Sequence, residues 1–335
     1  MSGEIDTGAL ESWLRREMPG RGEGFAVERV AGGQSNPTFF LMLGAERLVL
    51  RKQPPGELLP SAHAIDREFR VMRALGGTGV PVPEVVLYCD DREVIGTPFY
   101  LMRRVEGRVF HEARLPGVEP EERRVMYASL ARTLAALHNV DPDAVGLGDY
   151  GRQGGYFARQ IARWTKQWNL SRQGDNADIE YLIDWLPGAI PEDNATAISH
   201  GDYRVGNVMF HPARPEVAAV LDWELSTLGH PLADLAHFCI AWHSGPDEYG
   251  GLRGLDLAAM GLPEQAAFED AYGAEARHGL GLGPFHIAFA LFRFAVVFEG
   301  IAARAKAGTA ADPHAGQHAH LAKVFARAAR AALDG

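Results

Sequence analysis

Short segments in which apolar and polar residues alternate, or apolar residues follow one another, dominate the first hundred residues. Glycine, proline, asparagine and aspartate separate them, as in 32–37 and 90–92. We predict five strands, at 25–30, 38–43, 48–52, 84–88 and 98–105. Two segments instead repeat apolar residues every three or four positions, which predicts helices at 6–18 and 61–75. This part is therefore expected to be a small antiparallel sheet with one helix, preceded by a short helix.

Helical periodicity prevails from about residue 119 onward. We predict helices at 121–138, 154–170, 176–186, 231–243, 263–278, 284–305 and 312–333. The exception is a pair of short apolar strands on either side of residues 200–207. The chain is thus expected to be an α+β protein, with a β-rich lobe at 1–103 and a larger, mainly helical lobe at 104–335.

Composition narrows the choice of partners and of compartment. The chain has 33 basic and 43 acidic residues, and the net charge of -10 gives no reason to expect nucleic acid as a partner. Cys89 and Cys239 lie far apart in apolar segments, so we expect no disulfide framework and a reducing cytoplasm. The acidic N-terminus lacks the layout of a secretory signal. The apolar segment Phe285–Ile301 is interrupted by a histidine, an arginine and a glutamate, which predicts a buried helix and no membrane span.

The residues with the clearest chemistry lie at 200–207, which read His-Gly-Asp-Tyr-Arg-Val-Gly-Asn. Asp222 follows fifteen residues later, at the end of an apolar run. A kinase needs a carboxylate that orients the attacking hydroxyl, then an amide oxygen and a second carboxylate that hold Mg²⁺ against the phosphates of ATP. Asp202, Asn207 and Asp222 supply these groups in that order. Each alone would more often form a turn or a helix cap, so the prediction rests on their spacing.

This pattern resembles the aminoglycoside phosphotransferase and choline kinase-like family, which shares the protein-kinase fold. The matching segments are Ala31–Asn36, Leu48–Arg51, Glu68, Leu134–His138, His200–Asn207, Asp222–Glu224 and Pro231–Ala236. They span roughly residues 25 to 300. The resemblance implies a bilobal, kinase-like fold and an ATP- and Mg²⁺-dependent kinase that acts on a small molecule.

The resemblance also implies roles for individual residues of the catalytic loop. Asp202 corresponds to the catalytic base or hydroxyl-orienting group, and Asn207 and Asp222 to the Mg²⁺ ligands. Asp234 resembles the aspartate that anchors this loop through backbone N–H groups, and we assign His200 to structural support of the same loop.

One basic and one acidic side chain in these motifs each have two possible roles. Arg204 can neutralise charge on the γ-phosphate or form a surface pair with an acid. Glu224 either assists the metal or supports the structure.

On the nucleotide side, the resemblance places Arg51 on the third strand, where it grips the α- and β-phosphates and pairs with Glu68. Lysine is commoner at this position in protein kinases, and Lys52 is adjacent, so the residue that faces the nucleotide stays open. The adenine is expected against Met102 and the backbone of Arg103 and Arg104, although Met102 is equally explained as a core residue. The phosphate loop would comprise Gly33, Gln34, Ser35 and Asn36, a segment that by itself is typical of a hairpin turn.

The acceptor is indicated by residues 151–172, which contain five basic residues and no acidic one. In a helix, Arg159, Arg163 and Lys166 lie near one another, which favours an anionic substrate. The segment resembles the kinase-like domain attached to some acyl-CoA dehydrogenases, which suggests a hydroxy acid or a hydroxyacyl-CoA. An aminoglycoside acceptor and a non-catalytic nucleotide-binding module are the alternatives.

Overall fold

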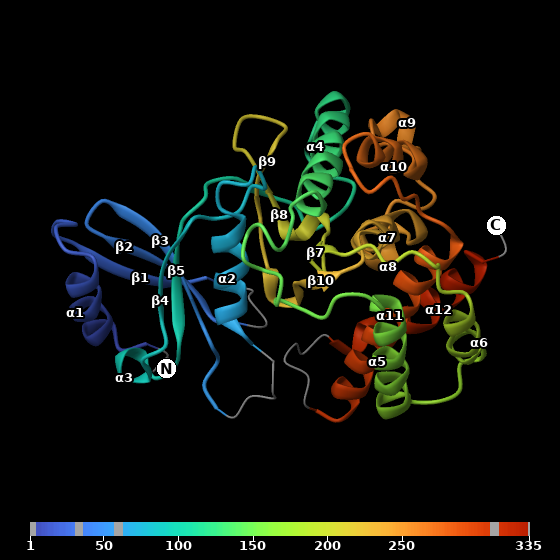
Figure 1. Ribbon diagram of the computed structural model, residues 1–335, viewed down its shortest axis with the longest axis horizontal. Coiled ribbons are helices and arrows are strands. Elements are labelled where there is room, and N and C mark those ends of the chain that lie inside the picture. The colour runs from blue at the N-terminus through green and yellow to red at the C-terminus, as the bar shows by residue number, and fades with distance from the viewer. Residues whose placement is uncertain (1–4, 31–35, 57–62, 309–314, 334–335) are drawn as a thin grey trace. The chain divides into compact units, whose positions relative to one another are not determined.

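The computed structural model of the protein describes residues 5–30, 36–56, 63–308 and 315–333 (Figure 1). The chain forms two compact units. The first comprises residues 1–106 together with 221–224, and the second comprises 107–220 and 225–335. Asp222 therefore belongs to the first unit, although it follows a strand of the second.

The first unit is built on an antiparallel sheet with the strand order β1-β2-β3-β5-β4. The bounds are β1 Phe25–Arg29, β2 Thr38–Leu43, β3 Glu46–Lys52, β4 Val85–Cys89 and β5 Phe99–Arg103. The five predicted strands are all present, and their ends differ from the prediction by at most two residues. The described part of this unit also contains the helices α1 Thr7–Glu17, α2 Ile65–Leu75 and α3 Arg92–Ile95.

The two faces of this sheet contact different helices. Leu48 and Leu50 of β3 lie in an apolar cluster that includes two leucines of α1. Arg51 points to the opposite face, because side chains alternate along a strand, and there it forms an ion pair with Glu68 of α2. Lys52 is buried on the same side of β3 as the leucines. Alternation thus directs Arg51, and not Lys52, toward α2.

Two details of the first unit differ from the sequence prediction. His63 has a φ of 56°, which is incompatible with a right-handed helix, so α2 begins at Ile65 and not at 61. Residues 61 and 62 lie outside the described part. The segment predicted as a turn at 90–92 instead starts the one-turn helix α3, whose first turn is capped by the Asp91 carboxylate, 2.8 Å from the N–H of Glu93.

The second unit is mainly helical. Its helices are α4 Pro120–His138, α5 Tyr156–Ser171, α6 Ala177–Trp185, α7 Pro231–His243, α8 Pro246–Tyr249, α9 Leu257–Met260, α10 Gln265–Gly273, α11 Pro284–Lys306 and α12 Leu321–Ala331. The single-turn helices α8 and α9 were not predicted, because four residues are too few to show a helical period. The helix predicted at 312–333 starts only at Leu321, after a separate 3₁₀ turn at Ala315–His318.

Five short strands flank or lie close to residues 200–207 in the second unit. They are β6 Arg108–Val109, β7 Ala197–Ser199, β8 Val208–Phe210, β9 Val217–Val220 and β10 Thr227–Gly229. The strands predicted on either side of residues 200–207, β7 and β9, do not pair with each other. β7 pairs with β10, and β9 forms a hairpin with β8. The reason is that β8 follows Asn207 directly and takes β9 as its partner.

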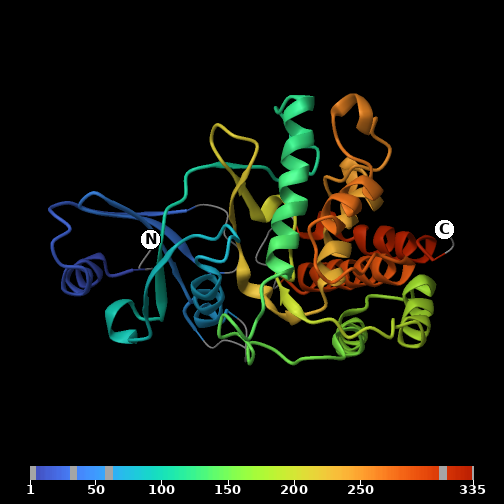
Figure 2. The same cartoon turned by 45° about the horizontal axis from the view of Figure 1, so that its top comes forward.

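The long helix α11 is the core of the second unit. It packs against α5, α7 and α12, and both views show α11 and α12 side by side (Figures 1 and 2). Among the described residues it alone is long and apolar enough to cross a membrane, but 72% of its apolar window is buried inside the protein. The predicted burial of Phe285–Ile301 is therefore confirmed.

Candidate active site

The loop that carries the predicted catalytic residues turns sharply at Gly201, directly after β7. The φ of this residue is 83°, and a Cβ at this position would lie 2.6 Å from the carbonyl oxygen of Leu225. Only glycine has both the backbone freedom and the small size that this turn requires. Gly201 thus sets the direction in which Asp202 leaves the strand.

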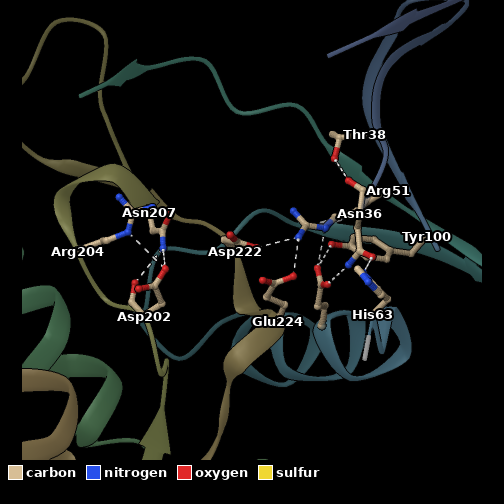
Figure 3. Close-up of polar contacts among 11 residues, drawn as sticks. Asn36, Thr38, Arg51, His63, Tyr100, Asp202, Arg204, Asn207, Asp222 and Glu224 are labelled. Carbon is tan, nitrogen blue, oxygen red and sulfur yellow. Dashed lines mark hydrogen bonds and ion pairs between the residues drawn. The ribbon is translucent and has the colours of Figure 1, made fainter. Parts of the chain in front are cut away.

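The carboxylate of Asp202 accepts hydrogen bonds on both of its oxygens. Oδ2 lies 2.6 Å from Nδ2 of Asn207 and 3.4 Å from Nε of Arg204 (Figure 3). Oδ1 lies 2.9 Å from Nε2 of His237. Burial alone would raise the pKa of Asp202, but the hydrogen bond with His237 and the charge of Arg204 outweigh burial and lower this pKa. Asp202 is therefore an oriented carboxylate that is ionised at neutral pH.

Asn207 lies at the end of a 3₁₀ turn, Val205–Asn207, immediately before β8. Its Nδ2 donates to the backbone oxygen of Asp202 at 2.9 Å as well as to the carboxylate. With the amide nitrogen held in this way, the amide oxygen is the atom of the side chain that can bind a cation.

The backbone of the catalytic loop is held by the first turn of α7. The two carboxylate oxygens of Asp234 accept the N–H groups of His200 and Gly201 at 2.6 and 2.9 Å. Burial would raise the pKa of Asp234, but hydrogen bonds from His138 and from the loop lower it to about 2. His200 in turn accepts the N–H of Asp202 on Nδ1 at 3.2 Å. These are the contacts that the family resemblance implies for an anchoring aspartate.

Two further residues contact this loop and are not predicted by the sequence pattern. His237 contacts Asp202, and Nη2 of Arg293 in α11 donates to the backbone oxygen of Gly201 at 2.5 Å. His237 follows Asp234 by three residues in a predicted helix, which places both on one face and was an available signal. Arg293 interrupts an otherwise apolar helical segment, and a charge in such a segment requires a partner.

The first unit carries a separate buried cluster around Glu68, which is fully enclosed. Its carboxylate accepts Nδ2 of Asn36 at 2.7 Å and the hydroxyl of Tyr100 at 3.0 Å, and Nε of Arg51 lies 2.9 Å away (Figure 3). The implied Arg51–Glu68 pair is thus present. Burial disfavours the charged guanidinium, but the neighbouring carboxylates raise the pKa of Arg51, which stays charged.

Asp222 belongs to the same cluster of the first unit. Its Oδ1 accepts Nη2 of Arg51 at 2.8 Å, and Glu224 Oε2 lies 4.0 Å from the same nitrogen (Figure 3). Asp222 has a φ of 63°, in the left-handed region that few residues other than glycine adopt. The structure therefore gathers the carboxylates of Glu68 and Asp222 around the guanidinium of Arg51.

The remaining nucleotide residues predicted from the sequence have mixed outcomes. Gly33, Gln34 and Ser35 lie outside the described residues. Asn36 is buried and uses its side chain to support Glu68. Met102 is half-buried on β5.

The backbone of Arg103 and Arg104, predicted to meet the adenine, takes part in the sheet of the first unit. The N–H groups of Arg103 and Arg104 donate to the carbonyl oxygens of Glu84 and Arg47, at 2.8 and 3.0 Å. The guanidinium of Arg103 pairs with Glu46 and Glu84. These two amides are therefore committed to the sheet, and an adenine contact through this backbone stays a prediction for the carbonyl oxygens.

The three basic residues predicted to lie near one another on α5 have different surroundings. The guanidinium of Arg159 donates to the carbonyl oxygens of Gly154 and, at 2.8 Å, of Arg152. Arg159 therefore closes the loop before α5, which sequence spacing alone did not indicate. Arg163 and Lys166 are exposed, and Arg163 lies over the ring of Trp164 at 5.4 Å.

A cavity of about 50 Å³ in the second unit lies against Arg204 and His237, two of the residues that contact the Asp202 carboxylate. Its other walls are mainly apolar and include Tyr249 and Phe294. Its lining contains no aspartate or glutamate. A ligand in this cavity would therefore meet a guanidinium and aromatic rings.

The sheet with its buried arginine–glutamate pair, and the loop with an aspartate and an asparagine five residues apart, are the parts of a kinase-like phosphotransferase. A profile of the phosphotransferase enzyme family matches residues 26–278, which is most of the chain. The chain belongs to this family.

Solved structures agree with this assignment. A candidate aminoglycoside phosphotransferase from Ralstonia eutropha JMP134 is 43% identical, and the comparison covers 98% of this chain and 99% of that chain with a TM-score of 0.88. A mutant aminoglycoside phosphotransferase APH(4)-Ia, solved with AMP-PNP and hygromycin B, has a TM-score of 0.63 over 98% of this chain and 99% of that one. At 18% identity it shows the fold alone. The predicted α+β, kinase-like fold is confirmed.

One relative is named as an acyl-CoA dehydrogenase and not as a phosphotransferase. Acyl-CoA dehydrogenase family member 10 of Mus musculus is 40% identical over 334 residues, which is 97% of this chain and 31% of that protein. The chain thus spans about a third of the length of this relative. The predicted likeness to a domain of some acyl-CoA dehydrogenases is confirmed.

Proposed function

We propose that the protein is an ATP- and Mg²⁺-dependent kinase that transfers the γ-phosphoryl group to a hydroxyl of a small molecule. The observation that carries this proposal is the carboxylate of Asp202. It is ionised, fixed by donors on both oxygens and followed five residues later by Asn207. A carboxylate held in this way can accept the hydrogen bond of an acceptor hydroxyl and orient its oxygen for attack.

The reaction forms a bond between the acceptor oxygen and the γ-phosphorus and breaks the bond to the oxygen that bridges the β- and γ-phosphates. Asp202 receives the hydroxyl proton or directs it to solvent, with its low pKa favouring orientation over strong basicity. Arg204, which lies beside Asp202, is suited to neutralise charge on the γ-phosphate.

The donor atoms of Asn207 and Asp222 fit Mg²⁺, because both offer hard oxygens. Among the described residues, no group of three or more histidines, cysteines and carboxylates is arranged so that it could hold a metal ion. This suits Mg²⁺, which commonly takes one or two protein ligands together with the phosphates. When bound, the ion would neutralise charge on the β- and γ-phosphates.

Arg51 would bind the α- and β-phosphates while Glu68 fixes its orientation, with residues 33–36 as the phosphate loop and Met102 against the adenine. The AMP-PNP bound to the APH(4)-Ia mutant supports ATP as the nucleotide.

For the acceptor we propose an anionic hydroxy compound, a hydroxy acid or a hydroxyacyl-CoA. Arg163 and Lys166 are exposed on α5, and Lys166 lies at an apolar cavity of about 630 Å³ between α5 and the segment after α6. The name of the relative in the mouse, an acyl-CoA dehydrogenase, favours an acyl-CoA over an aminoglycoside.

The proposal is tested by ATP consumption with hydroxy acids, hydroxyacyl-CoAs, choline-like alcohols and aminoglycosides as acceptors. We expect turnover with an anionic acceptor. Asp202→Ala should lower kcat by about 10²- to 10⁴-fold, because it removes the oriented carboxylate, and leave the Kd of Mg-ATP nearly unchanged. Asp270→Ala, at an exposed position of α10, is the control and should retain activity.

Turnover with aminoglycosides alone would contradict the anionic acceptor but not the kinase. Nucleotide binding without turnover of any acceptor would favour the alternative of a non-catalytic binding module. We also propose a cytoplasmic location, since the two buried cysteines are free thiols.

A further inference from the structure

His237 contacts the carboxylate of Asp202 from a different direction than the other side chains do. Asn207 and Arg204 both donate to Oδ2, whereas His237 donates to Oδ1. A carboxylate held at a single oxygen can still rotate about its Cβ–Cγ bond. A donor at the second oxygen removes this freedom, so His237 determines the plane of the Asp202 carboxylate.

The imidazole is placed to act as a donor and little else. Its side chain is 2% exposed, and its ring packs against Phe294 at a centroid distance of 5.1 Å. Burial lowers the pKa of His237 despite the opposing effect of Asp202, so the ring is neutral at physiological pH. The contact with a carboxylate then places the single ring proton on Nε2. Nδ1 is buried and has no hydrogen-bond partner among the described residues.

The backbone of the loop does not depend on His237. Asp234, one turn earlier on the same face of α7, holds the N–H groups of His200 and Gly201, and Arg293 holds the carbonyl of Gly201. Helix α7 thus anchors the loop twice, at the backbone through Asp234 and at the reactive side chain through His237. This separation allows the effect of His237 on Asp202 to be tested without loss of the loop.

We propose that His237 is a positioning residue of the phosphoryl-transfer site, which donates Nε2–H to Asp202 and so fixes the direction in which this carboxylate accepts the acceptor hydroxyl. The inference rests on the proposed function for its kinetic consequence and on the contacts above for the geometry. It defines a short pattern in α7, an aspartate followed three residues later by a histidine.

The test compares two substitutions of His237 that differ in whether the new side chain can donate a hydrogen bond. His237→Gln can place an amide N–H near the position of Nε2, whereas His237→Leu cannot donate. We expect His237→Leu to lower kcat about 10- to 100-fold, the effect of one lost hydrogen bond to a charged group. The KM for ATP should change by less than about twofold, and His237→Gln should recover most of kcat. His243→Gln, on the same helix but bonded to Gln265, is the control.

A crystal structure of each variant supplies a readout that does not need activity. We expect the Asp202 carboxylate to keep its plane in His237→Gln and to rotate in His237→Leu, with residues 200–201 unmoved. The proposal is overturned if the carboxylate keeps its plane in the leucine variant, or if both variants lose kcat equally while remaining folded. If the wild-type protein phosphorylates no acceptor, the proposed function fails, yet the carboxylate plane still decides the role of His237.

Discussion

At the scale of single residues, the backbone of Asp222 is the least expected feature. Its φ of 63° costs an L-residue roughly 1 kcal/mol, although aspartate and asparagine tolerate this region better than others. The contact with Arg51 stabilises the carboxylate in this conformation. The strain is therefore accepted at a residue that we propose as a metal ligand, as is common for functional sites.

Substitutions at Asp222 separate its backbone role from its charge. Both Asp222→Asn and Asp222→Ala should weaken Mg²⁺-dependent nucleotide binding, because each removes the carboxylate. The alanine variant should be less stable than the asparagine variant by about 1 kcal/mol, since only asparagine tolerates the left-handed region. Calorimetric nucleotide titration with and without EDTA, and urea unfolding, measure the two effects. Equal stability of the two variants would show that the backbone imposes no strain.

The residues of the site differed in how readily the sequence revealed them. Asp202 and Asn207 are close in sequence and chemically distinctive, and Glu68 was paired with Arg51 through the family resemblance. The contact of His237 with Asp202 joins residues 35 positions apart, and that of Arg293 with Gly201 joins residues 92 positions apart. Such contacts depend on how helices pack, which a periodic pattern does not specify. Arg159 donates to carbonyl oxygens of the loop before α5. A helical pattern does not include that loop, so it does not predict these contacts.

At the scale of elements, the first turn of α7 organises the catalytic loop. Asp234 is buried, accepts two backbone N–H groups and also lies 3.4 Å from Nε2 of His138 in α4. An amide in place of this carboxylate would lack the charge and would have one acceptor oxygen instead of two. It therefore could not serve all three donors. The carboxylate thus links α7 with α4 and with the loop after β7.

We therefore expect Asp234→Asn to destabilise the protein by about 2–4 kcal/mol, the effect of buried donors without a full partner. Hydrogen exchange should accelerate first at the N–H groups of His200 and Gly201. Thermal unfolding and exchange mass spectrometry measure both quantities. Asp270→Asn, at an exposed position, should change neither. Retention of exchange protection in the Asp234 variant would mean that other contacts hold the loop.

The elements were predictable where their pattern was long. α4, α7 and α11 were placed to within one residue because many apolar positions repeat along them. The one-turn helices α3, α8 and α9 were not, since capping by side chains, as at Asp91, decides them. The pairing of β7 with β10 instead of β9 depends on tertiary arrangement, which short strands do not encode.

At the scale of the whole molecule, stability depends on groups that must stay neutral in the core. His286 in α11 is buried among the rings of Phe157, Phe285 and His230. Burial, together with the neighbouring His230, lowers its pKa to about 4. Between pH 6.5 and 4 the unfolded chain binds a proton that the folded protein does not, so unfolding becomes easier as the pH falls through this window.

His286→Gln should remove this pH dependence. In the wild type, the free energy of unfolding should fall by about 1–2 kcal/mol more between pH 7 and pH 5 than it does in the variant. Denaturant unfolding at several pH values measures the difference. His318→Gln, at an exposed site, controls for the loss of a histidine. Parallel pH profiles of wild type and His286→Gln would contradict the assignment.

The segment from Asp222 to Asp234 bears on how such an enzyme is controlled. Within twelve residues the chain completes a 3₁₀ turn, pairs β10 with β7 and enters α7, while Ser226 bonds the hydroxyl of Tyr150 at 2.6 Å. Most of this segment is therefore committed to a 3₁₀ turn, a paired strand or the start of a helix. For the kinase that we propose, the interval of twelve positions from Asp222 to Asp234 leaves no room for a long activation segment that phosphorylation could switch.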